Sequence, residues 1–146
     1  MNTIDLSNSE PIYSIGVAAR KVGVAVPTLR LYEKEGLIVP YRTSTNRRLY
    51  SVNDLRIVTS ARELIQTRGL NFAGIRRLMS YLPCWKIRGC DPALYRDCQV
   101  PYITDSPCWS GGKASWRTCD GDCQSCRVYD LAPQIGNLSI YDFTRT

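Results

Sequence analysis

The seven cysteines of this chain fall in one segment, and this placement constrains the fold more than any other feature. None precedes Cys84, and all lie between Cys84 and Cys126. The excess of positive charge lies in the other half of the chain. Residues 1–83 carry twelve Lys or Arg against six Asp or Glu, whereas residues 84–146 carry seven basic and seven acidic residues. A chain of 146 residues has room for one ordinary domain, or for a small domain joined to a minimal one. The two compositions therefore predict two parts with separate tasks.

The composition also excludes several classes of protein. Histidine is absent, which removes His-based acid–base catalysis, Cys–His nucleophile pairs and mixed Cys/His zinc sites. We therefore expect no enzyme. No apolar run is long enough to span a bilayer, and residues 1–10 lack the basic start and apolar middle of a secretion signal. We expect a cytoplasmic protein without a membrane partner.

Two short helices are predicted at the start of the basic part. Apolar residues recur with helical spacing over 15–22, Ser14 is placed to cap this helix, and Gly23 to end it. The second helix begins near Pro27, whose fixed φ suits a first helical turn, and ends at Gly36. Its side chains able to reach phosphates or base edges are Thr28, Arg30, Tyr32 and Lys34. Two amphipathic helices of this kind also occur as plain core elements.

A basic hairpin is predicted next, over residues 41–50. Two short extended pieces flank a polar turn in which Asn46 tolerates a left-handed conformation. Arg47 and Arg48 can straddle a phosphate backbone from this wing. The alternative is an ordinary solvated hairpin.

Two further helices complete the basic part. Ser51 and Asp54 form a capping-box-like start, and apolar residues mark a buried stripe up to Gly69. Asn71 caps a last helix, which Pro83 stops.

These motifs together resemble the winged-helix DNA-binding domain of MerR-family transcription regulators over residues 12–82. The matching stretches are Tyr-Ser-Ile-Gly at 13–16, Gly-Val at 23–24, Thr-Leu-Arg-Leu-Tyr-Glu at 28–33, Glu-Gly-Leu at 35–37, Arg-Leu-Tyr-Ser at 48–51, Asp-Leu at 54–55 and Arg-Gly-Leu at 68–70.

The resemblance implies a homodimer that places two recognition helices in successive major grooves of double-stranded promoter DNA. It also implies distortion of the promoter spacer so that RNA polymerase can engage it. The residues that we expect to contact DNA are Arg20, Thr28, Arg30, Tyr32, Arg42, Arg47, Arg48 and Tyr50.

Three features depart from the family's pattern. Ala25 stands where a capping Ser is common, next to an unusual Pro27, and Asn46-Arg47 replaces the usual Gly-Tyr of the wing. Pro83 and a Gly-, Pro- and Cys-rich segment follow where a long dimerisation helix is usual. The dimer interface is therefore left open by the sequence.

The cysteine-rich segment, residues 83–130, shows little regular structure because prolines and glycines interrupt it. We expect a crosslink in place of an apolar core. Disulfides are disfavoured by the odd number of cysteines and a reducing cytosol. The candidate metal ligands are Cys84, Cys90, Cys98, Cys108, Cys119, Cys123 and Cys126.

All-thiolate ligation suits either an iron–sulfur cluster, such as [4Fe–4S], or zinc. Cys119, Cys123 and Cys126 bring three thiolates close together, and the spacing leaves the fourth ligand open. Pro-Cys-Trp at 83–85 is repeated at 107–109, and with the remaining cysteines it resembles the two-CW cysteine-motif module over residues 84–129.

The predicted fold is mainly α: a winged helix-turn-helix domain with a small, irregular cysteine-rich domain stapled by a metal or cluster. The predicted divisions are a flexible N-terminus (1–10), the DNA-binding domain (11–82), the cysteine-rich domain (83–130) and a tail (131–146).

The predicted function is a MerR-type regulator whose iron–sulfur cluster senses redox state, nitric oxide or iron and controls promoter distortion. The alternative is a structural zinc site, or direct sensing of a soft ion such as Zn(II), Cu(I) or Hg(II). A zinc-stapled interaction module without DNA binding is a different class. A dithiol enzyme using Cys123 and Cys126 is disfavoured because a thioredoxin-like α/β pattern is missing.

Overall fold

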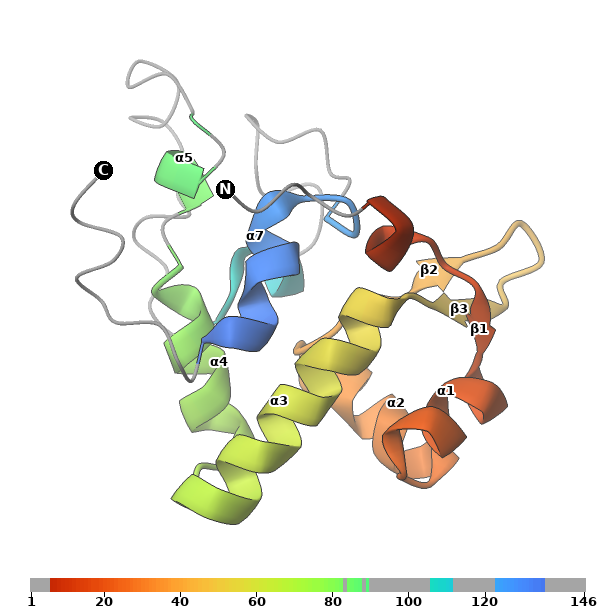
Figure 1. Ribbon diagram of the computed structural model, residues 1–146, viewed down its shortest axis with the longest axis horizontal. Helices are drawn as coiled ribbons and strands as arrows, with labels where there is room; N and C mark the ends of the chain where they lie inside the picture. Colours follow the sequence, from red (N-terminus) through yellow and green to blue (C-terminus); the bar gives the residue numbers. More distant parts are fainter. Residues whose placement is uncertain (1–5, 83, 88, 90–105, 112–122, 136–146) are drawn as a thin grey trace.

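The protein is described by a computed structural model that places residues 6–82, 84–87, 89, 106–111 and 123–135 (Figure 1). The elements of the first part are η1 (Leu6–Ser9), β1 (Tyr13–Ser14), α1 (Ile15–Val22), α2 (Val26–Lys34), β2 (Tyr41–Arg42), β3 (Arg48–Tyr50), α3 (Val52–Arg68) and α4 (Phe72–Ser80). Those of the second part are α5 (Cys84–Ile87), η3 (Cys108–Gly111), α7 (Arg127–Leu131) and η5 (Ala132–Gln134).

Helix ends in the first part follow the capping signals of the sequence. The Ser14 side chain accepts a hydrogen bond from the backbone N–H of Val17, and α1 ends at Gly23 with φ 82°. At α3, Ser51 and Asp54 form the predicted capping box, and Gly69 ends the helix in the left-handed conformation. Asn71 caps α4 through the backbone N–H of Gly74 at 2.8 Å. These predicted boundaries are confirmed.

The wing is a hairpin of β2 and β3, as predicted, but it belongs to a three-stranded antiparallel sheet. The strand order is β1-β3-β2, with Tyr13 opposite Tyr50 and Tyr41 opposite Leu49. Strand β1 was not predicted, because two residues are too few to show an alternating pattern. Asn46 has φ 64° in the wing turn, which confirms the predicted left-handed residue.

The two parts share one hydrophobic core. Buried side chains of α1 to α4 belong to the same cluster as Trp109, Val128, Tyr129 and Ala132. Trp109 packs edge-to-face against Tyr129, with ring centroids 5.1 Å apart. The sequence predicted a cysteine-rich part with no core of its own. In the structure, its described segments use the core of the first part, with η5 packed against α3.

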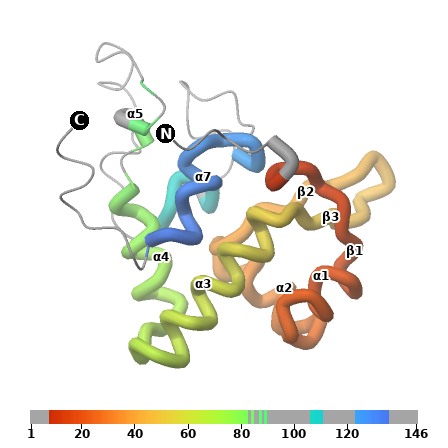
Figure 2. The backbone as a smooth tube through the Cα atoms, viewed as in Figure 1, coloured from red at the N-terminus to blue at the C-terminus, as the bar shows by residue number. Residues whose placement is uncertain are grey.

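The second part lies along the helices rather than apart from them (Figures 1 and 2). The turn η5 packs against α3, and α7 packs against α5. Ala132 is fully buried, so the described start of the predicted tail is a packed segment. Within the described residues, no helix has the length and apolar character needed to cross a membrane.

Candidate nucleic-acid interface and thiol cluster

Helices α1 and α2 form a helix-turn-helix joined by residues 23–25. The backbone N–H groups of Gly23 and Val24 both donate to the carbonyl of Ala19, at 2.9 and 3.0 Å. Ala25 caps α2 without a side-chain hydrogen bond, as its sequence predicts, and Pro27 lies in the first turn. The tight turn fixes the angle at which α2 leaves α1.

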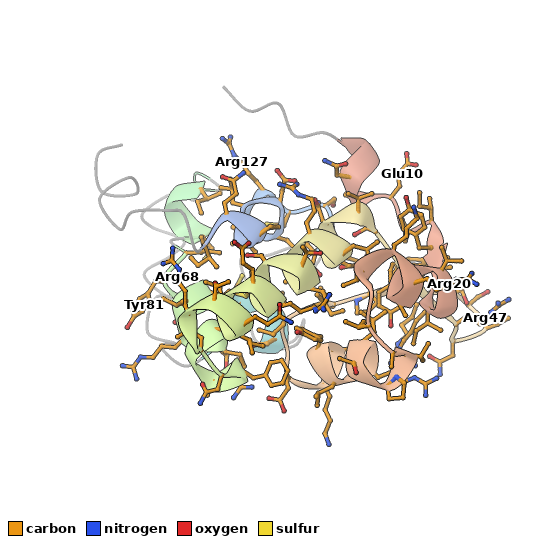
Figure 3. All side chains as sticks on the ribbon, turned by 60° about the horizontal axis from the view of Figure 1, so that its bottom comes forward. Glu10, Arg20, Arg47, Arg68, Tyr81 and Arg127 are labelled. Carbon is orange, nitrogen blue, oxygen red and sulfur yellow. The ribbon has the colours of Figure 1, made fainter. Side chains whose placement is uncertain are left out.

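Four of the five predicted DNA-binding arginines are exposed, and Arg42 in the wing is one of them. Arg20 lies on α1, Arg30 on α2 and Arg47 at the turn of the wing, while Thr28 is half-buried on α2. Figure 3 shows Arg20 and Arg47 at the same end of the molecule, with Arg68 at the opposite end. This end therefore gathers positive charge from two helices and a hairpin, an arrangement suited to a phosphate backbone.

Two tyrosines predicted to contact DNA lie in the core instead. Tyr32 is 3% exposed and packs edge-to-face against Phe72 with ring centroids 5.2 Å apart. Tyr50 is fully buried, and burial, with the Glu33 carboxylate next, raises the pKa of Tyr50 to about 12. The prediction took both for surface donors, but a large aromatic ring at a helix–sheet junction gains more by filling the core.

Glu33, at the end of α2, organises the wing and was missed in the sequence. Its carboxylate accepts hydrogen bonds from Arg48 at 2.6 Å and from Arg42 at 3.2 Å. Arg42 also donates to the side chain of Asn46 at 3.1 Å. Arg42 and Arg48, which were predicted to contact DNA, therefore tie the wing to α2. They lie 9 and 15 positions from Glu33, so no local sequence pattern indicated the pairing.

Four thiols gather where α5, η3 and α7 meet, and we call Cys84, Cys108, Cys123 and Cys126 the thiol cluster. Cys84 is buried, and the other three are half-buried against the shared core. A hydrogen bond with the Cys84 thiol, followed by burial and the nearby charges of Cys126 and Cys123, raises the pKa of Cys108 well above its ordinary value. Close packing of several thiols disfavours a second charge.

The thiol cluster does not have the geometry of a complete metal site. Among the described residues, no three Cys, Asp or Glu side chains are arranged as ligands of one ion. Three predicted ligands, Cys90, Cys98 and Cys119, lie outside the described residues.

A buried carboxylate lies between the two parts. Asp54 is 1% exposed, and burial raises its pKa to about 6 against the opposing effect of hydrogen bonds from Tyr129 and Ser51. Burial, and then the Asp54 charge, raises the pKa of Tyr129 well above its ordinary value. The hydrogen bond from Tyr129 to Asp54 joins residues 75 positions apart, so no local sequence pattern could predict it.

Comparison with known proteins agrees with the fold of the first part. Residues 13–82 match the family described as MerR HTH family regulatory protein. A putative heat shock protein HspR of Streptomyces coelicolor is 38% identical over 78 residues, which cover 53% of this chain and 52% of that protein. The HTH-type transcriptional regulator GlnR of Bacillus anthracis is 35% identical over 71 residues, covering 49% and 54%.

A further relative is an uncharacterized HTH-type transcriptional regulator, YyaN of Bacillus subtilis, 39% identical over 57 residues that cover 38% of this chain and 41% of that protein. The chain thus spans about half the length, or less, of the curated relatives it matches. The match, the helix-turn-helix and the wing coincide in sequence. Residues 13–82 are therefore a MerR-family helix-turn-helix domain.

Proposed function

We propose that this protein is a MerR-type transcription regulator that binds double-stranded promoter DNA as a homodimer. Helix α2 enters the major groove, and the wing contacts the phosphate backbone. The observation that carries the proposal is the placement of Arg20, Arg30 and Arg47, exposed on three elements of one helix-turn-helix and wing. The relatives' names as transcriptional regulators support it. Engagement of RNA polymerase by a distorted promoter belongs to the same proposal.

Substitution of Arg47 tests the DNA-binding surface. The probe is a duplex enriched from a random-sequence library by the full-length protein. We expect Arg47→Ala to weaken binding and to reduce the slope of log affinity against log salt by about one per protomer, because one phosphate contact is lost.

The matched control is Arg68→Ala, which removes the same charge at the opposite end of the molecule (Figure 3). It leaves both affinity and slope unchanged. Equal effects of the two substitutions, or no enrichment of any duplex, would favour the interaction module that binds an acidic partner protein.

We further propose that the cysteines hold a thiophilic metal centre, either an iron–sulfur cluster or zinc, that reports a signal. The chemistry of the donor set supports this, since four thiols from three separate segments gather at the edge of the core. Cys84, Cys108, Cys123 and Cys126 are the described residues that would hold such a centre. It would supply a redox-responsive or structural crosslink between their segments.

Metal analysis decides between the two centres. After anaerobic purification, iron, acid-labile sulfide and zinc are measured together with the visible absorption spectrum. Iron with sulfide and a brown colour supports the cluster, and colourless protein with stoichiometric zinc supports the zinc site. Protein without bound iron or zinc contradicts both.

A further inference from the structure

Helix α2 buries one face in the core and exposes the other. On the buried face, Leu29 is fully buried and Tyr32 is 3% exposed. The exposed face consists of residues spaced three and four positions apart, namely Pro27, Arg30, Leu31 and Lys34. This face combines two apolar side chains with two cations.

Leu31 is the large apolar side chain of the exposed face. It is 39% exposed, whereas Leu29 and Leu37 are fully buried. Pro27 lies one turn before it, so an apolar strip runs along the helix beside the charged side chains. A single exposed leucine is common at a protein surface, but this one lies on the helix that the proposed function places in the major groove.

The acidic residues at the end of α2 are bound to other elements. The Glu33 carboxylate accepts from Arg48 and Arg42 of the wing. Glu35, the C-cap residue, forms an ion pair with Arg76 on α4. The exposed face of α2 therefore carries positive charge without a carboxylate beside it, which favours the approach of a polyanion.

The major groove of DNA offers one apolar group for a leucine to contact. The base edges of guanine, adenine and cytosine present hydrogen-bond donors and acceptors there, and thymine adds its C5-methyl group. A leucine has no hydrogen-bonding group, so against another base it leaves a donor or acceptor unsatisfied. Against thymine it removes two apolar surfaces from water.

We propose that Leu31 is a specificity-determining residue that contacts the methyl group of a thymine in each half-site of the operator. Arg30 and Lys34 supply the charge that holds α2 at the groove, and Leu31 selects the base. This inference rests on the proposed function, because it requires α2 to lie in the major groove.

Replacement of thymine by deoxyuridine tests the contact, since deoxyuridine lacks only the methyl group and still pairs with adenine. The probe is the duplex enriched from a random-sequence library by the full-length protein, remade with each thymine replaced in turn. We expect one position in each half-site at which the replacement weakens binding about fourfold, because one buried methyl group is lost.

Leu31→Ala identifies the side chain responsible. We expect this variant to bind the original duplex several-fold more weakly and to bind the thymine and uracil duplexes equally, so that the two changes are not additive. Its slope of log affinity against log salt stays unchanged, because Leu31 neutralises no phosphate. Leu31→Met keeps an apolar side chain and retains the preference for thymine.

The matched control is Tyr81→Ala, which truncates another exposed apolar side chain. Tyr81 is 48% exposed and lies at the end of the molecule opposite Arg20 and Arg47 (Figure 3). The control keeps both the affinity for the duplex and the preference for thymine over uracil.

Two results overturn the inference: an affinity that no uracil replacement changes, or a thymine preference that persists in Leu31→Ala. Either result leaves the proposed function standing, because the duplex is still bound. Enrichment of no duplex contradicts the proposed function, and this inference with it.

Discussion

The two parts of this chain reach their structures by different routes. Helices α1, α3 and α4 each have a side-chain cap at their start, supplied by Ser14, Ser51 and Asn71. Helix α7 begins at Arg127, after Cys126, without a side-chain cap, and it has only five residues. Helices this short do not persist alone in water. The described segments of the second part are therefore ordered by what they pack against, chiefly the shared core and the backbone of Leu37 and Val39.

The strongest test of this difference is truncation of Trp109, which is 5% exposed in the shared core. We expect Trp109→Ala to lower the free energy of unfolding by about 3–5 kcal/mol, since it leaves a large cavity and the Leu37 carbonyl without its donor. Chemical denaturation followed by circular dichroism measures the effect on the helices of the first part.

The control for Trp109→Ala is Tyr81→Ala, an aromatic truncation at a residue that is 48% exposed. We expect it to cost less than about 1 kcal/mol. If Trp109→Ala costs no more than the control, the two parts do not share a core and the comparison above is wrong.

The next effect is a pH dependence of stability at the junction of the two parts. Asp54 has a pKa of about 6 in the folded protein against 3.8 for the ordinary side chain. Between these values the unfolded chain releases its proton first, so stability decreases as pH rises from about 4 to 6. From this difference between the two pKa values, ionisation of Asp54 lowers the free energy of unfolding by on the order of 2–3 kcal/mol at neutral pH.

Asp54→Asn removes the titrating group while keeping an oxygen that accepts from Tyr129. Thermal or urea unfolding of both proteins over pH 4–7 gives the difference between their stabilities. We expect this difference to shift in favour of the variant as pH rises. A constant difference across the range shows that Asp54 has an ordinary pKa.

The smallest expected effect is the loss of a helix cap in the first part. Ser51→Ala removes the capping side chain that accepts from the backbone N–H of Asp54 at 3.2 Å. We expect a loss of about 1–2 kcal/mol in the free energy of unfolding.

Thr59→Ala is the control, since Thr59 is an exposed residue in the middle of the same helix and bonds only a backbone carbonyl of its own helix at 2.8 Å. It should be neutral within about 0.5 kcal/mol. A Ser51→Ala variant as stable as this control would mean that packing, rather than capping, sets the start of α3.

The caps, the turns and the wing could be predicted from the sequence because each depends on residues within a few positions of one another. Ser51 and Asp54 are three apart, and Asn46 needs only its own left-handed φ. The placement of Arg20, Arg30 and Arg47 at exposed positions agrees with their polar character.

Tyr32 and Tyr50 were wrongly predicted to lie at the DNA-binding surface. A tyrosine has an apolar ring and a polar hydroxyl, so its presence in a sequence does not show whether the ring faces DNA or the core. The pairing of Glu33 with Arg42 and Arg48 was missed because it depends on how the wing folds back over α2.

The sequence by itself determined the helix-turn-helix, the wing and the confinement of all seven cysteines to one segment, since local hydrogen bonding and composition suffice for these. Only the tertiary structure decided that Trp109, Gln124 and Tyr129 reach back to residues 37 and 39. The physical reason is that buried backbone groups must find partners, and here those partners lie 72 to 90 positions away.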